Sequence, residues 1–216
     1  MIKVYGLKIS NHSAMIRFAL MEKKIEYEWE ETFPFSMSGD KAILDRSAQG
    51  AVPILECDGK FYSETQAIMS FIEKKFPDIS LISSDPSEYA KTIEIIKIFE
   101  LYVEYQARHF YPSVFFGAEQ NLDNIEEIKV KISRGLNIIE KKAAFSPYIL
   151  GQFSYADIYA SLVLSTTYEV CQKIYNWDIF QDFKKLAEVF KVINSRETAK
   201  IIYDDIAKGM EALKKS

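Results

Sequence analysis

The chain has 216 residues, of which 48% are hydrophobic and 27% charged, and 27 basic against 31 acidic side chains give a net charge of −4. This composition is typical of a globular protein with a sizeable core, and it excludes collagen-like and intrinsically disordered chains. The acidic balance argues against nucleic acid as the main partner, because phosphate binding needs a basic surface. Two histidines and two cysteines leave little for a metal centre, because a zinc site usually takes three or four such ligands.

Nothing in the sequence predicts a membrane segment or a secretion signal. The charge-free run Ala143–Ala156 contains Pro147 and Gly151 and is too short to cross a bilayer. The N-terminus begins directly with an apolar alternation, unlike a signal peptide. Cys57 and Cys171 are expected to be buried thiols rather than a disulfide. The sequence therefore predicts a cytoplasmic protein that binds no metal, membrane or nucleic acid.

Residues 1–77 predict the element order β-α-β-α-β-β-α. Apolar residues alternate in the expected strands and recur at helical spacing in the expected helices. Before residue 50 the predicted elements are a strand Ile2–Gly6, a helix from Ser13 to about Lys24, a strand Tyr27–Glu31, a loop Thr32–Gly39 and a short helix Asp40–Arg46.

A β-hairpin is the clearest local prediction. Asp58-Gly59 separates the strands Pro53–Cys57 and Lys60–Tyr62, and an Asp-Gly pair is typical of a two-residue hairpin turn. A helix then begins at Ser63 to Thr65 and ends before Pro77. Residues 78–87 are rich in turn formers and are expected to be a linker.

The remaining residues, 88–216, predict an all-helical domain without strands. A long helix is expected over Glu88–Tyr111, and the isoleucines and leucine between residues 125 and 139 form the apolar stripe of another. Ser154 and Asp157 predict a capping box with a structural role. Further helices are expected at Ala156–Tyr168, Phe180–Phe190 and Ser195–Leu213.

Several polar residues in the first 77 predict a binding site. Ser10-Asn11-His12-Ser13 lies between the first strand and the first helix, where unpaired N–H groups and the helix dipole favour an anion. Ser10 is expected before this helix, and Ser13 is either only its N-cap or a polar group of the site. Val52-Pro53 enters a strand at a turn and is a candidate cis bond. Ser63-Glu64-Thr65 supplies a second helix start, so we expect a small-molecule site between two helix N-termini.

These residues also carry a family resemblance, which covers the whole chain. Residues 1–77 resemble the thioredoxin-like domain of cytosolic glutathione transferases, and the helical second part is similar to that of the same family. The matching segments, in family order, are Ser10 with Arg17–Leu20 seven residues later, Gly50–Leu55, Glu64–Ile68 and Gly151–Asp157. The resemblance implies a thioredoxin-like α/β domain with a mixed sheet and a cis-proline, followed by an all-α helical bundle.

The resemblance also implies roles for individual residues, with glutathione as co-substrate and no metal or other cofactor. Ser10 would donate a hydrogen bond to the glutathione sulfur and stabilise the thiolate, which is the nucleophile. His12 and Ser13 are alternative donors. The remaining contacts to glutathione would come from Lys41 at the glycine carboxylate, the Val52 backbone beside cis Pro53, and Glu64 with Thr65 at the γ-glutamyl end.

A small hydrophobic electrophile is expected against the long helix of the second domain. Tyr102, Tyr105, His109 and Tyr111 offer aromatic surface there, although such a stripe is also typical of core or interface packing. Glu64 likewise has an alternative as an acid that only complements the helix dipole.

Three functions are therefore open. The first is a homodimeric, serine-type glutathione transferase, favoured because Ser10, Glu64 and Thr65 are all present. The second is a non-catalytic transferase-like module that binds a protein partner. The third is a glutathione-dependent isomerase, for which His12 is the only indication.

Overall fold

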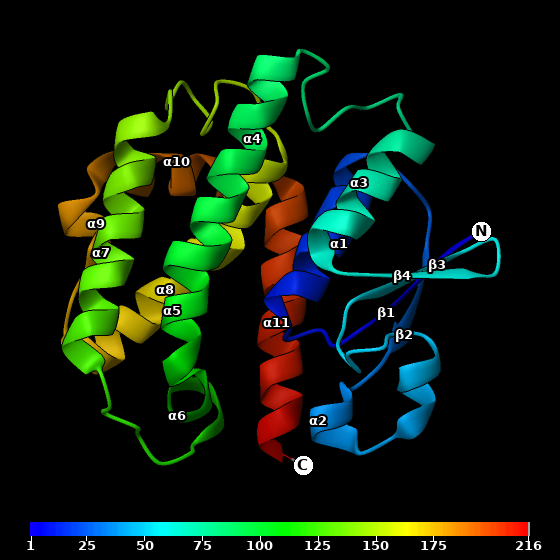
Figure 1. Ribbon diagram of the computed structural model, residues 1–216, viewed down its shortest axis with the longest axis horizontal. Coiled ribbons are helices and arrows are strands. Elements are labelled where there is room, and N and C mark those ends of the chain that lie inside the picture. Colours follow the sequence, from blue (N-terminus) through cyan, green and yellow to red (C-terminus); the bar gives the residue numbers. More distant parts are fainter. Residues whose placement is uncertain (216) are drawn as a thin grey trace. The chain divides into compact units, whose positions relative to one another are not determined.

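Four short strands form one mixed sheet in the computed structural model, which describes residues 1–215 (Figure 1). The strand order is β2-β1-β3-β4, with β1 (Ile2–Gly6) parallel to β2 (Glu28–Glu31) and antiparallel to β3 (Ile54–Cys57). β4 (Lys60–Ser63) completes the predicted hairpin with β3, and Asp58 and Gly59 both have positive φ angles, of 53° and 73°. Those angles suit the tight turn that an Asp-Gly pair favours. The four predicted strands and their order along the chain are confirmed.

Two helices of the sheet unit carry, at or next to their N-termini, the polar residues of the predicted site. α1 (Asn11–Glu22) and α3 (Thr65–Lys75) pack against each other, and both carry fully buried apolar residues such as Phe18 and Ile68. Burial of such side chains contributes about 1.5–3 kcal/mol each. The prediction for the first helix was two residues late at its start, because its N-cap is Ser10 rather than Ser13.

The connection between β2 and β3 contains two short helical turns that lie apart from α1 and α3 (Figure 1). The 3₁₀ turn η1 (Lys41–Asp45) agrees with the predicted short helix. The segment Thr32–Gly39 was predicted as a loop, but it contains the single-turn helix α2 (Phe35–Ser38). Gly39, at φ 67°, closes that turn in the left-handed conformation that glycine adopts without steric cost.

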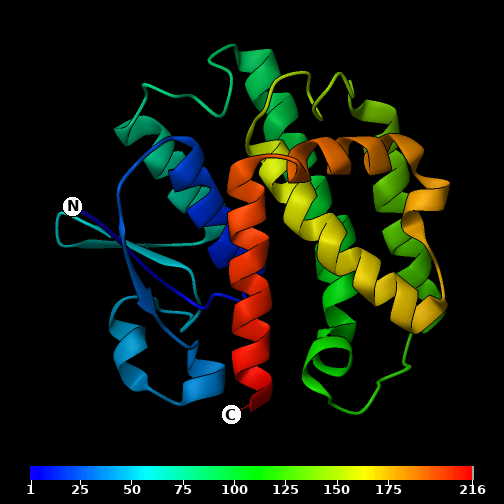
Figure 2. The ribbon, with the colours of Figure 1, turned by 180° about the vertical axis from the view of Figure 1, so that it is seen from behind.

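The C-terminal helix α11 (Glu197–Lys215) packs along α1, as both views of the ribbon show (Figures 1 and 2). Residues 1–81 and 196–215 therefore form one compact unit, and residues 82–195 form the other. The sequence placed this helix in the second domain, since periodicity identifies a helix without indicating where it packs. Ser216, the end of the predicted second domain, lies outside the described residues.

The second unit is helical, and within its described residues 82–195 the only β-type pairing is an isolated bridge between Leu150 and Gln152. Helix α8 (Tyr155–Tyr175) is its most buried element and packs against α4, α6 and α10. The helices of this unit are α4 (Pro86–Ile98), α5 (Tyr105–Ala107), α6 (Tyr111–Phe116), α7 (Ile125–Lys142), α8, α9 (Ile179–Asp182) and α10 (Lys184–Asn194).

The expected helix Glu88–Tyr111 is not one regular α-helix. It changes to a π-helical turn η2 (Phe99–Glu104), then to α5, a 3₁₀ turn η3 (Arg108–Phe110) and α6. The π turn lies against α7 at Gly135, where an added Cβ would be 2.9 Å from the Tyr102 carbonyl oxygen. Pro112 lacks an N–H group, so the helical hydrogen bonding is interrupted again near α6. Apolar periodicity does not reveal such changes of helix type.

The predicted capping box at the start of α8 is confirmed. The fully buried Asp157 carboxylate accepts hydrogen bonds from the Ile149 and Ser154 N–H groups, both at 2.8 Å, and from the Ser154 hydroxyl at 3.1 Å. Ser154 Oγ in turn accepts from the Ala156 N–H group at 3.2 Å. These bonds stabilise the helix start and hold the preceding loop against it.

Replacement of Asp157 by alanine is expected to destabilise the protein by about 3 kcal/mol, because two buried N–H groups then lack an acceptor. Ser154→Ala removes only the cap oxygen and is expected to cost about 1 kcal/mol. Urea unfolding of both variants checks this difference. Equal losses of stability in Asp157→Ala and Ser154→Ala would show that the carboxylate acts only as part of the cap.

No helix in the described part of the chain is long and apolar enough to cross a membrane.

Candidate functional site

Ser10 occupies the N-cap of α1. Its Oγ accepts a hydrogen bond from the Ser13 N–H group at 3.3 Å, and its backbone has the extended conformation typical of a cap. In that bond the hydroxyl is an acceptor, so its own proton remains available for donation. The side chain is half-buried at the positive end of the helix dipole. The residue can therefore cap the helix and donate to an anion.

Ser13 lies in a different environment from Ser10. It is fully buried, and its Oγ lies within 2.7 Å of where a Cβ on Gly6 would be placed. Ser13 thus fills the space left by a glycine of β1, and its prediction as the N-cap is wrong. Of the three candidate donors to the sulfur, Ser10 and His12 are half-buried and Ser13 is enclosed.

Glu64 and Thr65 begin α3. Glu64 is exposed and has the unusual φ angle of 68° for a non-glycine residue, and its side chain makes no capping hydrogen bond. Backbone conformations of this kind cost about 1–3 kcal/mol and occur often at binding sites. Its carboxylate is instead held by Gln49, whose Nε2 donates to Glu64 Oε1 at 2.8 Å.

A direct hydrogen bond connects the two helix starts. His12 Nδ1, in the first turn of α1, lies 2.8 Å from Oγ1 of Thr65, the first residue of α3. Thr65 is only 5% exposed, and His12 is half-buried. The N-termini of α1 and α3 are therefore neighbours, and both leave unpaired N–H groups in this part of the unit.

The segment before β3 completes this side of the unit. The peptide bond between Val52 and Pro53 is cis, as predicted. Gly50 has a φ of 62°, and an added Cβ would lie 2.6 Å from Phe35 Cβ, so glycine is required here. No motif in the sequence pointed to Gln49 itself. The one indication in the sequence was its position directly before Gly50, which begins the matched segment Gly50–Leu55.

Lys41 and Val52 lie on neighbouring segments. Val52 packs against a small buried cluster of Tyr5, Ile43 and Ile54, and Ile43 belongs to the same 3₁₀ turn as Lys41. The Lys41 side chain is exposed. All candidate residues of the glutathione site belong to the sheet unit. A direct contact joins His12 to Thr65, whereas Val52 and Lys41 lie on the segments that pack on Tyr5 and Ile54.

The aromatic candidates of the helical unit separate into two groups. Tyr102, Tyr105 and His109 are exposed, with Tyr102 at 49% and Tyr105 at 67%, so they share an outward face of the η2–η3 segment. Tyr111 is half-buried, and its hydroxyl donates to Thr166 Oγ1 of α8 at 2.9 Å. Burial raises the pKa of the Tyr111 hydroxyl, which therefore stays protonated.

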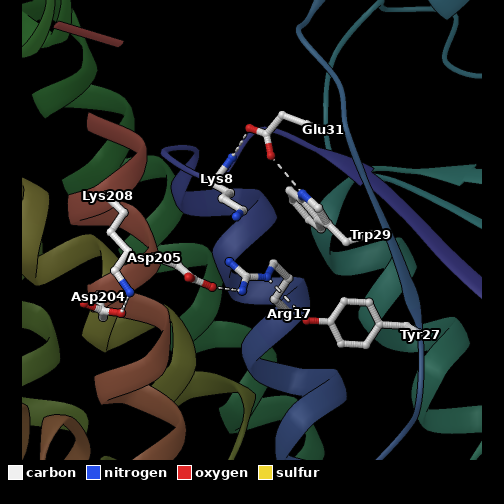
Figure 3. Close-up of polar contacts among 8 residues, drawn as sticks. All are labelled: Lys8, Arg17, Tyr27, Trp29, Glu31, Asp204, Asp205 and Lys208. Carbon is white, nitrogen blue, oxygen red and sulfur yellow. Dashed lines mark hydrogen bonds and ion pairs between the residues drawn. The ribbon is translucent and has the colours of Figure 1, made fainter. Parts of the chain in front are cut away.

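Polar contacts hold α1 and the loop before it (Figure 3). The Arg17 guanidinium donates to Asp205 of α11, and its Nε donates to the Tyr27 hydroxyl at 3.3 Å. Glu31 accepts from the Lys8 N–H group at 3.0 Å and from Trp29 Nε1 at 2.8 Å. Lys8 precedes Ser10 by two residues, so Glu31 helps to hold the loop that carries it.

Neither cysteine is set up as a nucleophile. Both are buried, and burial raises the pKa of the Cys57 thiol and raises that of Cys171 to about 12. Over residues 1–215, no group of three or more histidine, cysteine, aspartate or glutamate side chains is arranged to hold a metal ion. The arrangement offers a hydroxyl donor, a carboxylate and two helix N-termini, which together suit a ligand with both a negative and a positive group.

Comparison with known proteins gives consistent results. Residues 4–80 match the family model described as "Glutathione S-transferase, N-terminal domain". A glutathione S-transferase of Pseudomonas putida is 31% identical over 206 residues, covering 94% of this chain and 92% of that protein. The fold is similar to that of glutathione transferase E6 from Drosophila melanogaster, with a TM-score of 0.82, 19% identity and coverage of 100% and 97%. A glutathione S-transferase of Methylobacillus flagellatus, solved with glutathione bound, has a TM-score of 0.78 at 19% identity and coverage of 94% and 98%.

Proposed function

The chain belongs to the glutathione S-transferase family, and we propose on that premise that it joins the sulfur of glutathione to a small hydrophobic electrophile. The bound thiol loses its proton to solvent, and the thiolate attacks the electrophilic carbon. A C–S bond forms while a leaving group departs or an electron pair moves onto the acceptor and is protonated. The observation that carries this proposal is the direct link between two helix N-termini, with Ser10 at the cap of one of them.

Ser10 is assigned to the sulfur. Its hydroxyl accepts from the helix N–H group and retains a proton to donate to the thiolate. The positive end of α1 adds to that stabilisation. A decrease of about two units in the thiol pKa corresponds to about 2.7 kcal/mol of preferential binding of the thiolate. The enclosed position of Ser13 favours Ser10 over it as the donor.

The other ends of glutathione are assigned to the surrounding segments. Glu64 and Thr65 hold the γ-glutamyl end, the Val52 backbone beside Pro53 pairs with the cysteinyl part, and Lys41 neutralises the glycine carboxylate. Support comes from the contacts between Gln49 and Glu64 and from the exposed lysine on η1. Glutathione recognition is thus assigned to residues 1–77, with 78–87 as a linker.

The electrophile is assigned to residues 88–216, with Tyr102, Tyr105 and His109 as exposed aromatic contacts and the ring of Tyr111 as a minor one.

We further propose a cytoplasmic homodimer that needs no metal or other cofactor besides the co-substrate. Sedimentation of the purified protein tests the dimer, since a monomer at working concentrations would contradict it.

A glutathione titration followed by ultraviolet thiolate absorbance tests the proposal. Both protein thiols have raised pKa values, so new thiolate signal at neutral pH must come from glutathione. Saturable appearance of thiolate is the expected result. Binding without thiolate would favour the glutathione-dependent isomerase, and absence of binding would favour the protein-binding module.

Glu64→Ala is expected to raise the dissociation constant for glutathione about tenfold to thirtyfold, because a hydrogen bond to the charged amino group is lost. Gln49→Ala is the matched variant. It removes the amide that holds the carboxylate and leaves the charge, so a smaller increase of about threefold is expected. Calorimetry measures both constants. An unchanged constant in Glu64→Ala would restrict Glu64 to complementing the dipole of α3.

A further inference from the structure

The hydrogen bond between His12 and Thr65 controls how the Thr65 hydroxyl can meet a ligand. It joins side chains 53 residues apart, from the first turns of α1 and α3, at 2.8 Å. Thr65 is only 5% exposed. Neighbouring atoms therefore restrict the rotation of its hydroxyl and leave it few hydrogen-bond partners. The position of its proton is therefore decided largely by which atom of the His12 ring faces it and whether that atom carries hydrogen.

Two arrangements of the pair are chemically distinct. If His12 Nδ1 accepts the hydrogen bond, the Thr65 hydroxyl donates its only proton to the ring. Its oxygen can then only accept a hydrogen bond from a ligand. If Nδ1 carries a proton and donates, the hydroxyl keeps its own proton and can donate to an anion. The choice of tautomer thus selects whether Thr65 recognises a cation or an anion.

The surroundings of Thr65 favour the second arrangement. Thr65 is the first residue of α3, where unpaired N–H groups and the helix dipole attract a carboxylate. Glu64, next to it, carries the negative group suited to an ammonium. The γ-glutamyl end of glutathione bears both an amino group and an α-carboxylate, so the hydroxyl at the helix start complements the carboxylate.

We propose that His12 is a positioning residue, which donates from Nδ1 to Thr65 Oγ1 and so directs the Thr65 proton to the α-carboxylate of the γ-glutamyl group. This inference rests on the proposed function and deepens it. It assigns His12 to recognition of one carboxylate and leaves activation of the sulfur to Ser10.

The test uses glutathione and two analogues that each lack one charged group of the γ-glutamyl end. 4-Aminobutyryl-cysteinylglycine lacks the α-carboxylate, and glutaryl-cysteinylglycine lacks the amino group. His12→Ala is expected to raise the dissociation constant about tenfold for glutathione and for the glutaryl analogue, as befits a hydrogen bond to a charged group. For the 4-aminobutyryl analogue, the variant and the parent protein are expected to bind equally.

Three controls separate positioning from a general structural role. His12→Asn keeps a nitrogen donor near the place of Nδ1 and is expected to restore glutathione affinity to within about threefold of the parent. The double variant His12→Ala/Thr65→Val is expected to bind no more weakly than Thr65→Val alone, since His12 acts through Thr65. The pKa of bound glutathione thiol is expected to be the same in His12→Ala as in the parent.

Equal losses for all three ligands, additive effects in the double variant, or a raised thiol pKa in His12→Ala would each overturn the assignment. Thermal unfolding of each variant shows whether the fold is retained, and His12→Asn decides the matter if His12→Ala is unstable. If the parent protein binds no glutathione, the proposed function itself fails. If it binds and the analogues do not discriminate, only the role of His12 fails.

Discussion

Ser10→Ala is expected to lower kcat about 10²–10³-fold, the usual loss on removal of one donor to a developing or stabilised anion. The dissociation constant for glutathione is expected to change by less than about threefold, because the γ-glutamyl and glycine contacts are untouched. The bound thiol pKa rises at the same time, since the thiolate loses its hydrogen bond. Steady-state kinetics and thiolate absorbance against pH measure the two effects together.

The N-cap role of Ser10 requires a matched variant. Ser10→Ala also removes the acceptor for the Ser13 N–H group and is expected to cost about 1 kcal/mol of stability. Ser10→Gly lacks the hydroxyl as well, but glycine at an N-cap costs only a few tenths of a kcal/mol. If activity falls equally in both variants, the missing donor is the cause. Retention of activity in Ser10→Gly would place the sulfur contact elsewhere.

Asp205→Ala is expected to lower the free energy of unfolding by about 3 kcal/mol, since it leaves the Arg17 charge buried without its carboxylate. The Arg17 side chain is 8% exposed and that of Asp205 is 23% exposed, so solvent screens this ion pair weakly. The pair also connects α1 to α11, over 188 residues of sequence (Figure 3). Urea unfolding followed by circular dichroism measures the loss.

The neighbouring aspartate is the natural control. Asp204 forms an ion pair with Lys208 on the same helix, at 2.5 Å, but the two side chains are 60% and 70% exposed. Exposed pairs of this kind contribute less than about 1 kcal/mol, so Asp204→Ala is expected to be close to neutral. Comparable losses of stability in Asp204→Ala and Asp205→Ala would indicate a change in the helix propensity of α11 instead of the loss of a buried ion pair.

Local patterns were sufficient for much of the sheet unit. The Asp58-Gly59 turn, the alternating strands on either side of it and the cis bond before Pro53 were all predicted, and each depends on a few consecutive residues. The capping box of Ser154 and Asp157 was predicted for the same reason. Backbone conformation in such segments is set by the residue types themselves.

Features that depend on distant contacts were missed or misplaced. The π turn at Phe99–Glu104 lies against Gly135 of another helix, and apolar spacing contains no information about that approach. Gln49 holds the Glu64 carboxylate only because the fold brings the two side chains together. The start of α1 was placed two residues late because both Ser10 and Ser13 are good caps, and the burial of Ser13 against Gly6 decides between them.

By itself the sequence determined the order of the strands and the longer helices in residues 1–77, the helical character of the second unit and the family to which the chain belongs. These depend on periodicity, turn residues and short motifs, which are properties of neighbouring residues. The tertiary structure decided that His12 meets Thr65, that Arg17 meets Asp205 and that α11 packs on α1. Such contacts join residues 53 to 188 positions apart, and only the packing of the folded chain selects them.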